Sequence, residues 1–366
     1  MTLASVVIVN WNRRDDLLRA LESLGEQTHR ELEIIIVDNH STDGSPEAVK
    51  GLFPQVKLIE MPHSGFSACR TFNIGMEAAR GDIVVVMDND ATLEREWVER
   101  AVKHFSEDSR LGAVASRIIN VYKEHFYFQY DSWPEYSDED EYEIYTFRGC
   151  AFAIRADLLR RIGYFPEEYE IYVNEDDLAA RVWAAGYRIK YFSDLVARHY
   201  TSRVQRPGWR MVYFTTRNRI WNYIRYLSPS MALLHILWAL YMEGPMIMRA
   251  GQTRHMLRGI WHGLRELPRL GPKRRYVAEW ERVMWRNERD GLRRRRGRLP
   301  PAAEGRQASR RPDCGPGDES GGAREAEYGG GVDKDGARDR EMAKGWLRGG
   351  GRGVAGDGAS RVRNSA

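Results

Sequence analysis

The sequence predicts an α/β fold in which a mostly parallel central sheet is flanked by helices. In the first half of the chain, apolar runs of strand length alternate with helical patterns. Such alternation is typical of parallel sheets with right-handed crossovers. Residues 83–87 add a second observation, because five apolar residues, three of them valine, stand between polar breaks. A run of this kind is expected for a strand that is buried on both faces.

Each element of the first half has its own signal. The helix expected over residues 14–27 carries one apolar stripe of leucines. Another helix begins at Ser45, where a capping side chain is followed by Pro46 and by the acidic Glu47 near the positive end of the helix dipole. The remaining predicted elements are strands over residues 5–9, 33–37, 56–59 and 83–87, and a helix over residues 67–79.

The pattern changes after residue 110 to that of a mixed sheet. Strand-like segments surround Val114 and cover residues 126–130 and 145–154, and an acidic loop over residues 135–143 interrupts them. A helix over residues 174–185 ends at Gly186, a residue typical of helix C-caps. A further strand is expected over residues 188–192.

Composition divides the 366 residues into parts. Residues 1–225 form the α/β domain, with a nucleotide-binding half over 1–110 and a second half over 111–225. Residues 226–290 form a basic, amphipathic helical extension. In residues 291–366 glycine, arginine and aspartate dominate, so this tail cannot offset its ordering entropy and is expected to be disordered. The formal net charge of +4 is modest, and we expect no nucleic-acid partner.

The compartment is predicted from cysteines and apolar segments. Three cysteines without metal-ligand spacing favour a reduced, cytoplasmic protein. The residues before the first strand resemble no signal peptide. The apolar run 231–242 is short for a membrane span, and the following helical pattern places arginines beside apolar residues. We therefore expect peripheral contact with the inner face of the cytoplasmic membrane, and no span.

The most informative motif is Asp88-Asn89-Asp90, which directly follows the buried run over residues 83–87. Open α/β sheets bind ligands at the carboxyl ends of their strands. Two carboxylates at one strand tip repel each other unless a cation lies between them. A divalent ion that also holds phosphate oxygens meets this need. The alternative is an acidic loop that is merely solvated.

Other polar residues stand where strands end or helices begin. Asn10 ends the first strand and Asp38 the second, where its carboxylate could accept a hydrogen bond from the N3–H of uracil or thymine. Arg70 follows a glycine-containing segment and offers a fork for a diphosphate. The acidic series Glu175-Asp176-Asp177 opens the helix over residues 174–185, and His199 follows at a distance.

In this order the motifs resemble the inverting nucleotide-sugar glycosyltransferases of family 2, which have the GT-A fold. Within that family they are most similar to the bacterial rhamnosyltransferase-type enzymes of cell-surface polysaccharide assembly. The resemblance covers residues 4–225 and rests on the segments VNWN, VDNHSTDGS, NIG, ARGDIVVVMDND, RGCAFAIRADLLRRIGYF, NEDDLAARVWAAGYRI and TRNR.

The resemblance implies roles for the donor and metal residues. Asp38 would read the base of a UDP-, dTDP- or GDP-linked donor, with Asn10 nearby, and Asp88 would contact its ribose or sugar. Asp90 would bind Mg²⁺ or Mn²⁺, and His199 would complete the metal or diphosphate site. A surface histidine without such a role is the alternative for His199.

On the acceptor side, the resemblance implies that Gly149 and Cys150 line the site of a glycan or lipid-linked acceptor. The aromatic residues Trp133, Tyr136 and Tyr142 offer rings that stack on sugars. The general base lies in the acidic helix start. Because this chain is one residue shorter there than the family pattern, Glu175 is favoured by the downstream alignment and Asp176 by the acidic pair itself.

Two other functions fit parts of the sequence. A non-catalytic carbohydrate- or nucleotide-binding protein could keep the same fold, although both acidic sets are present. A sugar nucleotidyltransferase would require a glycine-rich basic loop after the first strand. Residues 10–14 contain no glycine, which disfavours that function.

Overall fold

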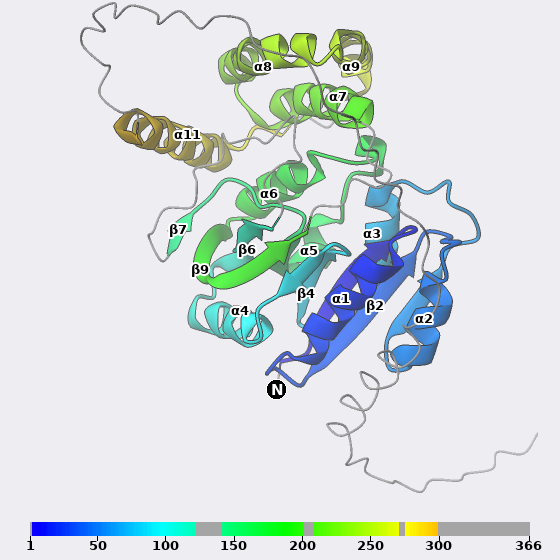
Figure 1. The fold of residues 1–366 in the computed structure, drawn as a ribbon. Helices are drawn as coiled ribbons and strands as arrows, with labels where there is room; N and C mark the ends of the chain where they lie inside the picture. The colour runs from blue at the N-terminus through cyan, green and yellow to red at the C-terminus, as the bar shows by residue number, and fades with distance from the viewer. Residues whose placement is uncertain (1, 122–140, 201–207, 271–274, 299–366) are drawn as a thin grey trace, which may run out of the picture. The chain divides into compact units, whose positions relative to one another are not determined.

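The computed structural model describes residues 2–121, 141–200, 208–270 and 275–298. Residues 1–301 group into one compact unit. Its centre is a mixed sheet with the strand order β3-β2-β1-β4-β8-β6-β9-β5, and β7 pairs with β9. Figure 1 shows this sheet with helices on both faces.

The first half of the chain forms the parallel part of the sheet. Strand β1 pairs in parallel with both β2 and β4, and β2 pairs with β3. The predicted alternation of strands and helices is confirmed. The elements are β1 (Ala4–Asn10), α1 (Arg14–Gly25), β2 (Leu32–Asp38), α2 (Ser45–Leu52), β3 (Lys57–Glu60), α3 (Ala68–Glu77) and β4 (Ile83–Asp88).

The second half adds antiparallel pairs, as expected for a mixed sheet. Strand β8 pairs in the antiparallel sense with β4 and β6, and β9 pairs in the same sense with β5 and β7. The elements are β5 (Ala91–Leu93), α4 (Trp97–Glu107), β6 (Leu111–Asn120), β7 (Glu141–Glu143), β8 (Ala151–Arg155), α5 (Ala156–Ile162), η1 (Glu167–Tyr169), α6 (Asn174–Ala184) and β9 (Arg188–His199).

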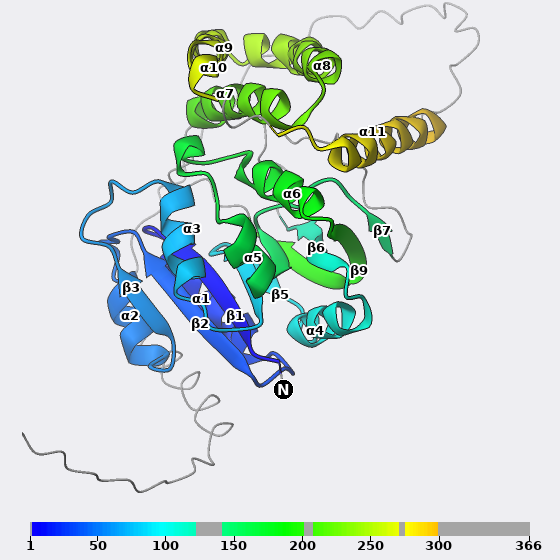
Figure 2. The same ribbon diagram turned by 180° about the vertical axis from the view of Figure 1, so that it is seen from behind.

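The two faces of the sheet have separate cores. Alternate residues of β1 and β4, such as Val7 and Val86, pack in one cluster with α3, α5 and α6. The other face is covered by α1 and α4, whose apolar stripes are buried. Figure 2 shows α3 and α5 in front of the sheet, on the face turned away from the viewer in Figure 1. This packing explains the NIG segment, because a Cβ on Gly75 would overlap Val7.

The predicted strand over residues 145–154 is wrong in its first half. Only Ala151–Arg155 is strand, whereas residues 144–150 form a connection. The backbone of Tyr145 finds its partners outside the sheet, because its carbonyl accepts from Trp280 Nε1 at 2.7 Å and its amide donates to Asn287 Oδ1 at 3.0 Å. Side chains of α11 (Ala278–Arg298) therefore bind the backbone groups that a neighbouring strand would otherwise bind.

Other boundaries also differ from the expectation. Strand β9 runs on from Phe192 to His199, and β5, α4 and α5 were not predicted. Tertiary pairing explains the extension, because the far part of β9 aligns with β5 and, after a register shift, with β6. The predicted strand over 126–130 lies outside the described residues.

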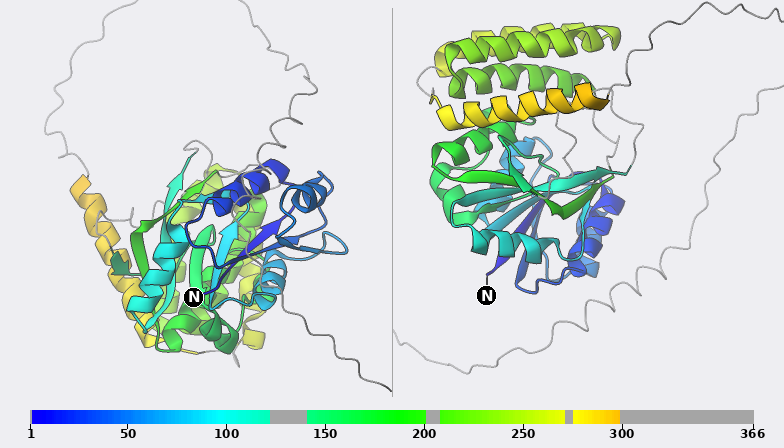
Figure 3. Two further views of the ribbon diagram at one scale, coloured as in Figure 1. Left: turned by 90° about the horizontal axis from the view of Figure 1, so that it is seen from below. Right: turned by 90° about the vertical axis from the view of Figure 1, so that its left-hand side faces the viewer.

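The C-terminal part is helical, as predicted. It contains α7 (Gly208–Tyr226), α8 (Pro229–Arg249), α9 (Thr253–Arg265), α10 (Leu267–Leu270) and α11 (Ala278–Arg298). Helices α8 and α9 both pack along α7, and the right-hand view of Figure 3 shows α8, α7 and the gold α11 running side by side. Residues 291–298, which the composition assigns to a disordered tail, are helical, whereas residues 299–366 lie outside the described residues.

Candidate active site

Three polar side chains join the carboxyl ends of the parallel strands. Asn10 and Asp38 are register partners on β1 and β2. Asn10 Nδ2 donates to Asp38 Oδ1 at 3.0 Å, and Asn10 Oδ1 accepts from Asn89 Nδ2 at 2.8 Å. All three residues are buried. Because buried polar groups are costly unless they are paired, this network holds the three strand ends in one arrangement.

Asp38 is almost fully enclosed, and both of its carboxylate oxygens accept hydrogen bonds from the protein. The residue is 1% exposed, and its second oxygen accepts from the backbone N–H of Ser41 at 2.7 Å. The carboxylate thus organises the loop after β2. Each carboxylate oxygen keeps a second lone pair for a ligand.

Asp88, Asp90 and His199 meet beside this network. One ligand atom from each residue lies within 4.8 Å of the others. The group is assembled by the sheet, because β4 delivers Asp88 and the pairing of Ala91 with His199 brings β9 beside the turn. His199 Nε2 lies 3.2 Å from Asp90 Oδ1 and 4.0 Å from Asp88 Oδ2.

The donor set of these three residues fits a divalent cation. Two carboxylates and an imidazole nitrogen are ligands of Mn²⁺ and related ions. His199 Nδ1 faces Asn120 Oδ1 at 3.4 Å. A proton on Nδ1 leaves the lone pair of Nε2 directed at the carboxylates, which is the tautomer that a metal requires.

Arg13 is a site residue that the sequence interpretation missed. Its Nη1 atom lies 2.8 Å from Asp90 Oδ2, and the two side chains are 9% and 0% exposed. A buried carboxylate needs such a partner. The signal was available, since Arg13 follows the first strand at the end where the acidic residues gather. Arg13 holds one oxygen of Asp90 and leaves the other toward Asp88 and His199.

Glu175 lies near Asp88, next to the backbone of Gly149. The Asp88 amide donates to the Cys150 carbonyl at 3.1 Å, and the preceding Gly149 lies against Glu175, whose carboxylate fills the place of a Cβ at this glycine. Desolvation raises the pKa of Glu175 to about 8, and the nearby charges of Asp176 and Asp88 act in the same direction. Asp88 and Glu175 therefore lie close enough for their charges to interact, and Cys150 and Gly149 connect them.

The three acids of the helix start have different surroundings. Asp176 accepts a hydrogen bond from Thr146 Oγ1 at 2.6 Å, and burial raises its pKa although Arg219 opposes the shift. Asp177 is bound by Arg225 at 2.9 Å and by the Tyr226 hydroxyl at 2.7 Å, so it ties α6 to α7. The negative charge of Asp88 contributes to the raised pKa of Glu175.

The backbone before Glu175 is strained and is held by α7. Glu170, Tyr172 and Val173 have φ values of 64°, 66° and 63°, a conformation that is costly for residues other than glycine. Asn218, which is fully buried, donates from Nδ2 to the carbonyls of Tyr169, Ile171 and Tyr172, each at 2.9 Å. The TRNR segment thus positions the start of α6.

Arg70 and Tyr142 contact residues other than Asp88, Asp90 and His199. Arg70 Nη1 pairs with Glu167 Oε1 at 2.8 Å, and both side chains are partly exposed. The Tyr142 ring packs on Tyr191 with centroids 5.0 Å apart. Trp133 and Tyr136 lie outside the described residues. Cys69 and Cys150 are buried and form no disulfide within the described residues, and Cys314 lies outside those residues.

Residues 5–163 match the family model described as Glycosyl transferase family 2. The probable glycosyltransferase YdaM of Bacillus subtilis is 25% identical over 219 residues, which are 55% of this chain and 51% of that protein. The chondroitin synthase of Pasteurella multocida is 29% identical over 141 residues, which are 37% of this chain and 14% of that protein. The chain thus spans about half the length of YdaM and much less of the synthase.

Solved structures confirm the predicted GT-A fold. S. aureus TarS 1-349 in complex with UDP-GlcNAc aligns with a TM-score of 0.57 and 17% identity, over 81% of this chain and 92% of that one. GalNAc-T7 with UDP, GalNAc and Mn²⁺ aligns with a TM-score of 0.51 and 17% identity, over 62% of this chain and 49% of that one. At these identities the likeness concerns the fold.

Replacing Asn218 by alanine tests the hold of α7 on the strained loop. The variant leaves three carbonyls without this donor, and we expect a loss of roughly 2–3 kcal/mol in the free energy of unfolding. Urea unfolding of the wild type and of Asn218→Ala measures this loss. Removal of an exposed amide elsewhere, Gln55→Ala, is the control. Equal stability of the three proteins would contradict the role of Asn218.

Proposed function

We propose that the protein is an inverting glycosyltransferase that moves a sugar from a nucleoside-diphosphate sugar to a hydroxyl of a glycan or lipid-linked acceptor. The observation that carries this proposal is the continuity between the two acidic sets. Asp88 connects through Cys150 and Gly149 to Glu175. In this proposal, a leaving-group site at Asp88 and a proton acceptor at Glu175 would lie on the two sides of one reacting sugar.

The donor side would be formed by the ends of β1, β2 and β4. Asn10 and Asp38 are assigned to the base, for which uracil or thymine offers the N3–H donor. Asp88 is assigned to the ribose or the sugar, and Arg70 to the diphosphate after release from Glu167. UDP and UDP-GlcNAc in complexes of S. aureus TarS, which shares the fold, support a donor of this class.

A divalent cation held by Asp88, Asp90 and His199 would neutralise the charge that develops on the departing diphosphate. Arg13 supports the same end of the site, because its guanidinium pairs with Asp90 and orients that carboxylate. Mn²⁺ in the GalNAc-T7 complex supports a metal in this fold. Mg²⁺ and Mn²⁺ both suit the ligand set.

The protein's own acid completes the reaction. Glu175, as its carboxylate, takes the proton of the acceptor hydroxyl while the hydroxyl oxygen bonds to C1 of the sugar. The bond between C1 and the diphosphate oxygen breaks in the same displacement, and the electron pair leaves with the nucleoside diphosphate. Attack from the face opposite to the leaving group inverts the anomeric centre. No covalent sugar–enzyme intermediate is required.

The acceptor is proposed to belong to cell-surface polysaccharide synthesis. The matched relatives include a chondroitin synthase and a hyaluronan synthase of Pasteurella multocida. Gly149 and Cys150 are assigned to the acceptor side because they adjoin Glu175. We place the reaction in the cytoplasm, at the inner face of the membrane, in keeping with the free cysteines.

The donor sugar is tested with a panel of nucleotide sugars. The likeness to rhamnosyltransferase-type enzymes rests on sequence motifs, so the panel includes a dTDP-linked deoxysugar beside UDP- and GDP-linked sugars. We expect metal-dependent release of nucleoside diphosphate from one donor. Binding of a nucleotide sugar without release, with a range of saccharide acceptors present, would indicate a non-catalytic binding protein.

Direct binding of Mn²⁺ tests the metal site apart from turnover. We expect Asp90→Asn and His199→Ala to weaken binding by at least about tenfold, since even groups that merely support a ligand have effects of that size. Isothermal titration and the electron paramagnetic resonance of Mn²⁺ give the affinity. His104→Ala, which alters a histidine paired with Asp194, is the matched control. Unchanged Mn²⁺ affinity in His199→Ala would remove this residue from the site.

Two isosteric substitutions decide which acid is the base. Glu175→Gln should lower kcat by about 10²- to 10⁴-fold, the usual contribution of a positioned base, while the donor still binds. Asp176→Asn should have a much smaller effect, because Asp176 is bound to Thr146. Turnover of the donor and acceptor found by the panel is measured for both variants. Full activity of Glu175→Gln together with loss in Asp176→Asn would transfer the role to Asp176.

The raised pKa of Glu175 predicts a pH dependence. A base must be deprotonated, so kcat/KM of the wild type should rise with pH through about 8. For folding the sign is opposite, since the pKa exceeds its ordinary value of 4.5 and stability falls as pH rises toward about 8. Glu175→Gln should therefore lose less thermal stability than the wild type between pH 5 and pH 9, as thermal melts at a series of pH values would measure. Parallel melting curves would contradict this.

A further inference from the structure

Helices α8 and α9 expose an unusual amount of apolar surface. Most of the large apolar side chains that are exposed in the described residues lie on these two helices. On α8, Leu237 is 55% and Tyr241 is 72% exposed, and on α9, Trp261 is 55% exposed. Single exposed apolar residues are ordinary, but contiguous groups of this kind mark binding surfaces.

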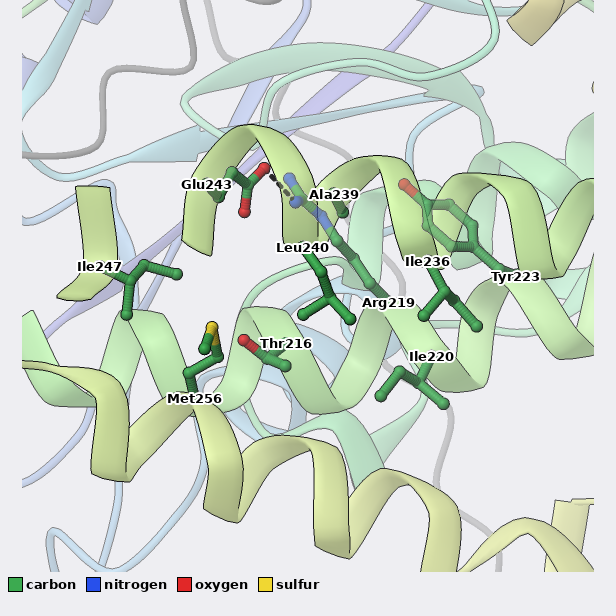
Figure 4. Close-up of a pocket in the computed structure, with 10 residues that line it drawn as sticks. All are labelled: Thr216, Arg219, Ile220, Tyr223, Ile236, Ala239, Leu240, Glu243, Ile247 and Met256. Atoms are coloured by element: carbon green, nitrogen blue, oxygen red, sulfur yellow. Dashed lines mark hydrogen bonds and ion pairs between the residues drawn. The ribbon is translucent and has the colours of Figure 1, made fainter. Parts of the chain in front are cut away.

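The exposed residues of α8 follow helical spacing. Leu234, Leu237, Trp238 and Tyr241 recur at intervals of three and four residues and share one face. The opposite face is lightly anchored, since α8 buries only Ala232, His235, Gly244 and Ile247. Figure 4 shows the cavity between α7, α8 and α9, which measures about 30 Å³. The apolar surface of α8 is thus directed outward more than into the core.

Helix α9 adds a basic edge to this surface. Leu257, Trp261 and Leu264 form an exposed apolar stripe at intervals of four and three residues. Arg254 and Arg265, which are also exposed, lie on one side of that stripe. The buried residues Met256, Gly259 and Gly263 face α7. Apolar rings and leucines beside a row of arginines match the boundary between lipid chains and anionic headgroups.

We propose that the exposed faces of α8 and α9 dock the protein on the surface of an anionic lipid bilayer. We infer a lipid partner from charge complementarity, because a row of arginines beside apolar residues fits phosphate headgroups above acyl chains. This inference names a partner for the proposed sugar transfer, but it does not depend on that chemistry.

The structure favours surface docking over a membrane span. By length and composition α8 is able to cross a bilayer. However, Glu243 of α8 pairs with Arg219 of α7 at 2.6 Å, as Figure 4 shows, and α7 is bound to the folded domain through Arg225 and Asp177. A spanning α8 would break the first pair and carry Glu243 into the hydrocarbon region, where a charge is costly.

Sedimentation of the full chain with vesicles tests the proposal. We expect binding to vesicles of equal parts phosphatidylglycerol and phosphatidylcholine, and much weaker binding to pure phosphatidylcholine. The double variant Arg254→Gln/Arg265→Gln should bind the anionic vesicles roughly 25-fold more weakly, from about fivefold per arginine. The control Arg30→Gln/Arg95→Gln removes two exposed arginines elsewhere and should bind like the wild type.

A second variant tests the apolar contribution. Leu237→Ser/Trp261→Ser should lose binding to anionic vesicles while keeping the circular dichroism and melting temperature of the wild type, because both side chains are exposed. No binding of the wild type, or equal binding of all variants, would overturn the proposal. Resistance of vesicle-bound protein to alkaline extraction would do so as well, since it would indicate a span.

Self-association of the protein through this surface would also overturn the proposal of membrane docking. If sedimentation velocity without lipid shows a dimer that Leu237→Ser/Trp261→Ser dissociates, and vesicle binding is unchanged, the surface joins two copies instead. Release of nucleoside diphosphate in a lipid-free assay is measured in parallel. Retained release with failed vesicle binding rejects only the docking surface, whereas retained vesicle binding without release rejects only the sugar transfer.

Discussion

Carboxylates gathered at one edge of a buried sheet must be compensated, and this requirement organises the site. Asp38 and Asp90 are each 1% exposed, so neither can rely on water. Asp38 is held by Asn10 and by the backbone after β2, and Asp90 by Arg13. These partners come from a strand and two loops that are separate in sequence, which means that the sheet must be assembled before the charges become tolerable.

The same requirement separates the acids of α6. Asp177 is neutralised by Arg225 and serves as a link between α6 and α7. Glu175 has no comparable cation in its resolved surroundings and carries a pKa of about 8. One acid thus links two helices, whereas the other, two residues earlier, has a strongly raised pKa. Perturbed pKa values of this kind cluster at functional sites, although structural networks produce them as well.

The helices after residue 207 take part in the α/β domain as well as extending it. Asn218 and Arg217 of α7 bind the carbonyls of the strained segment before α6. Trp280 and Asn287 of α11 bind the backbone of Tyr145, close to Thr146 and therefore to Asp176. The geometry around Glu175 and Asp176 consequently depends on residues far away in sequence. The surface that we propose for lipid binding lies on α8 and α9, and both of these helices pack against α7.

Local patterns carried much of the prediction. Apolar periodicity, capping residues and turn residues located the strands and helices of the first half, because these signals act over a few residues. The pair Asp88 and Asp90 was recognisable since a polar motif directly follows a buried strand. His199 was placed in the metal group only through the resemblance, and the distances agree with that placement.

Long-range pairing decided the rest. The extension of β9, the loss of the strand before Ala151 and the contact of Arg13 with Asp90 all depend on partners that no local window contains. The sequence left Glu175 and Asp176 as alternatives, and only the tertiary structure distinguished their surroundings. The local sequence pattern by itself determined that this chain builds an α/β sheet with acids at one edge, because burial and hydrogen bonding act locally on each strand. Which acid meets which cation was decided by the folded structure, because electrostatic partners are set by proximity in space.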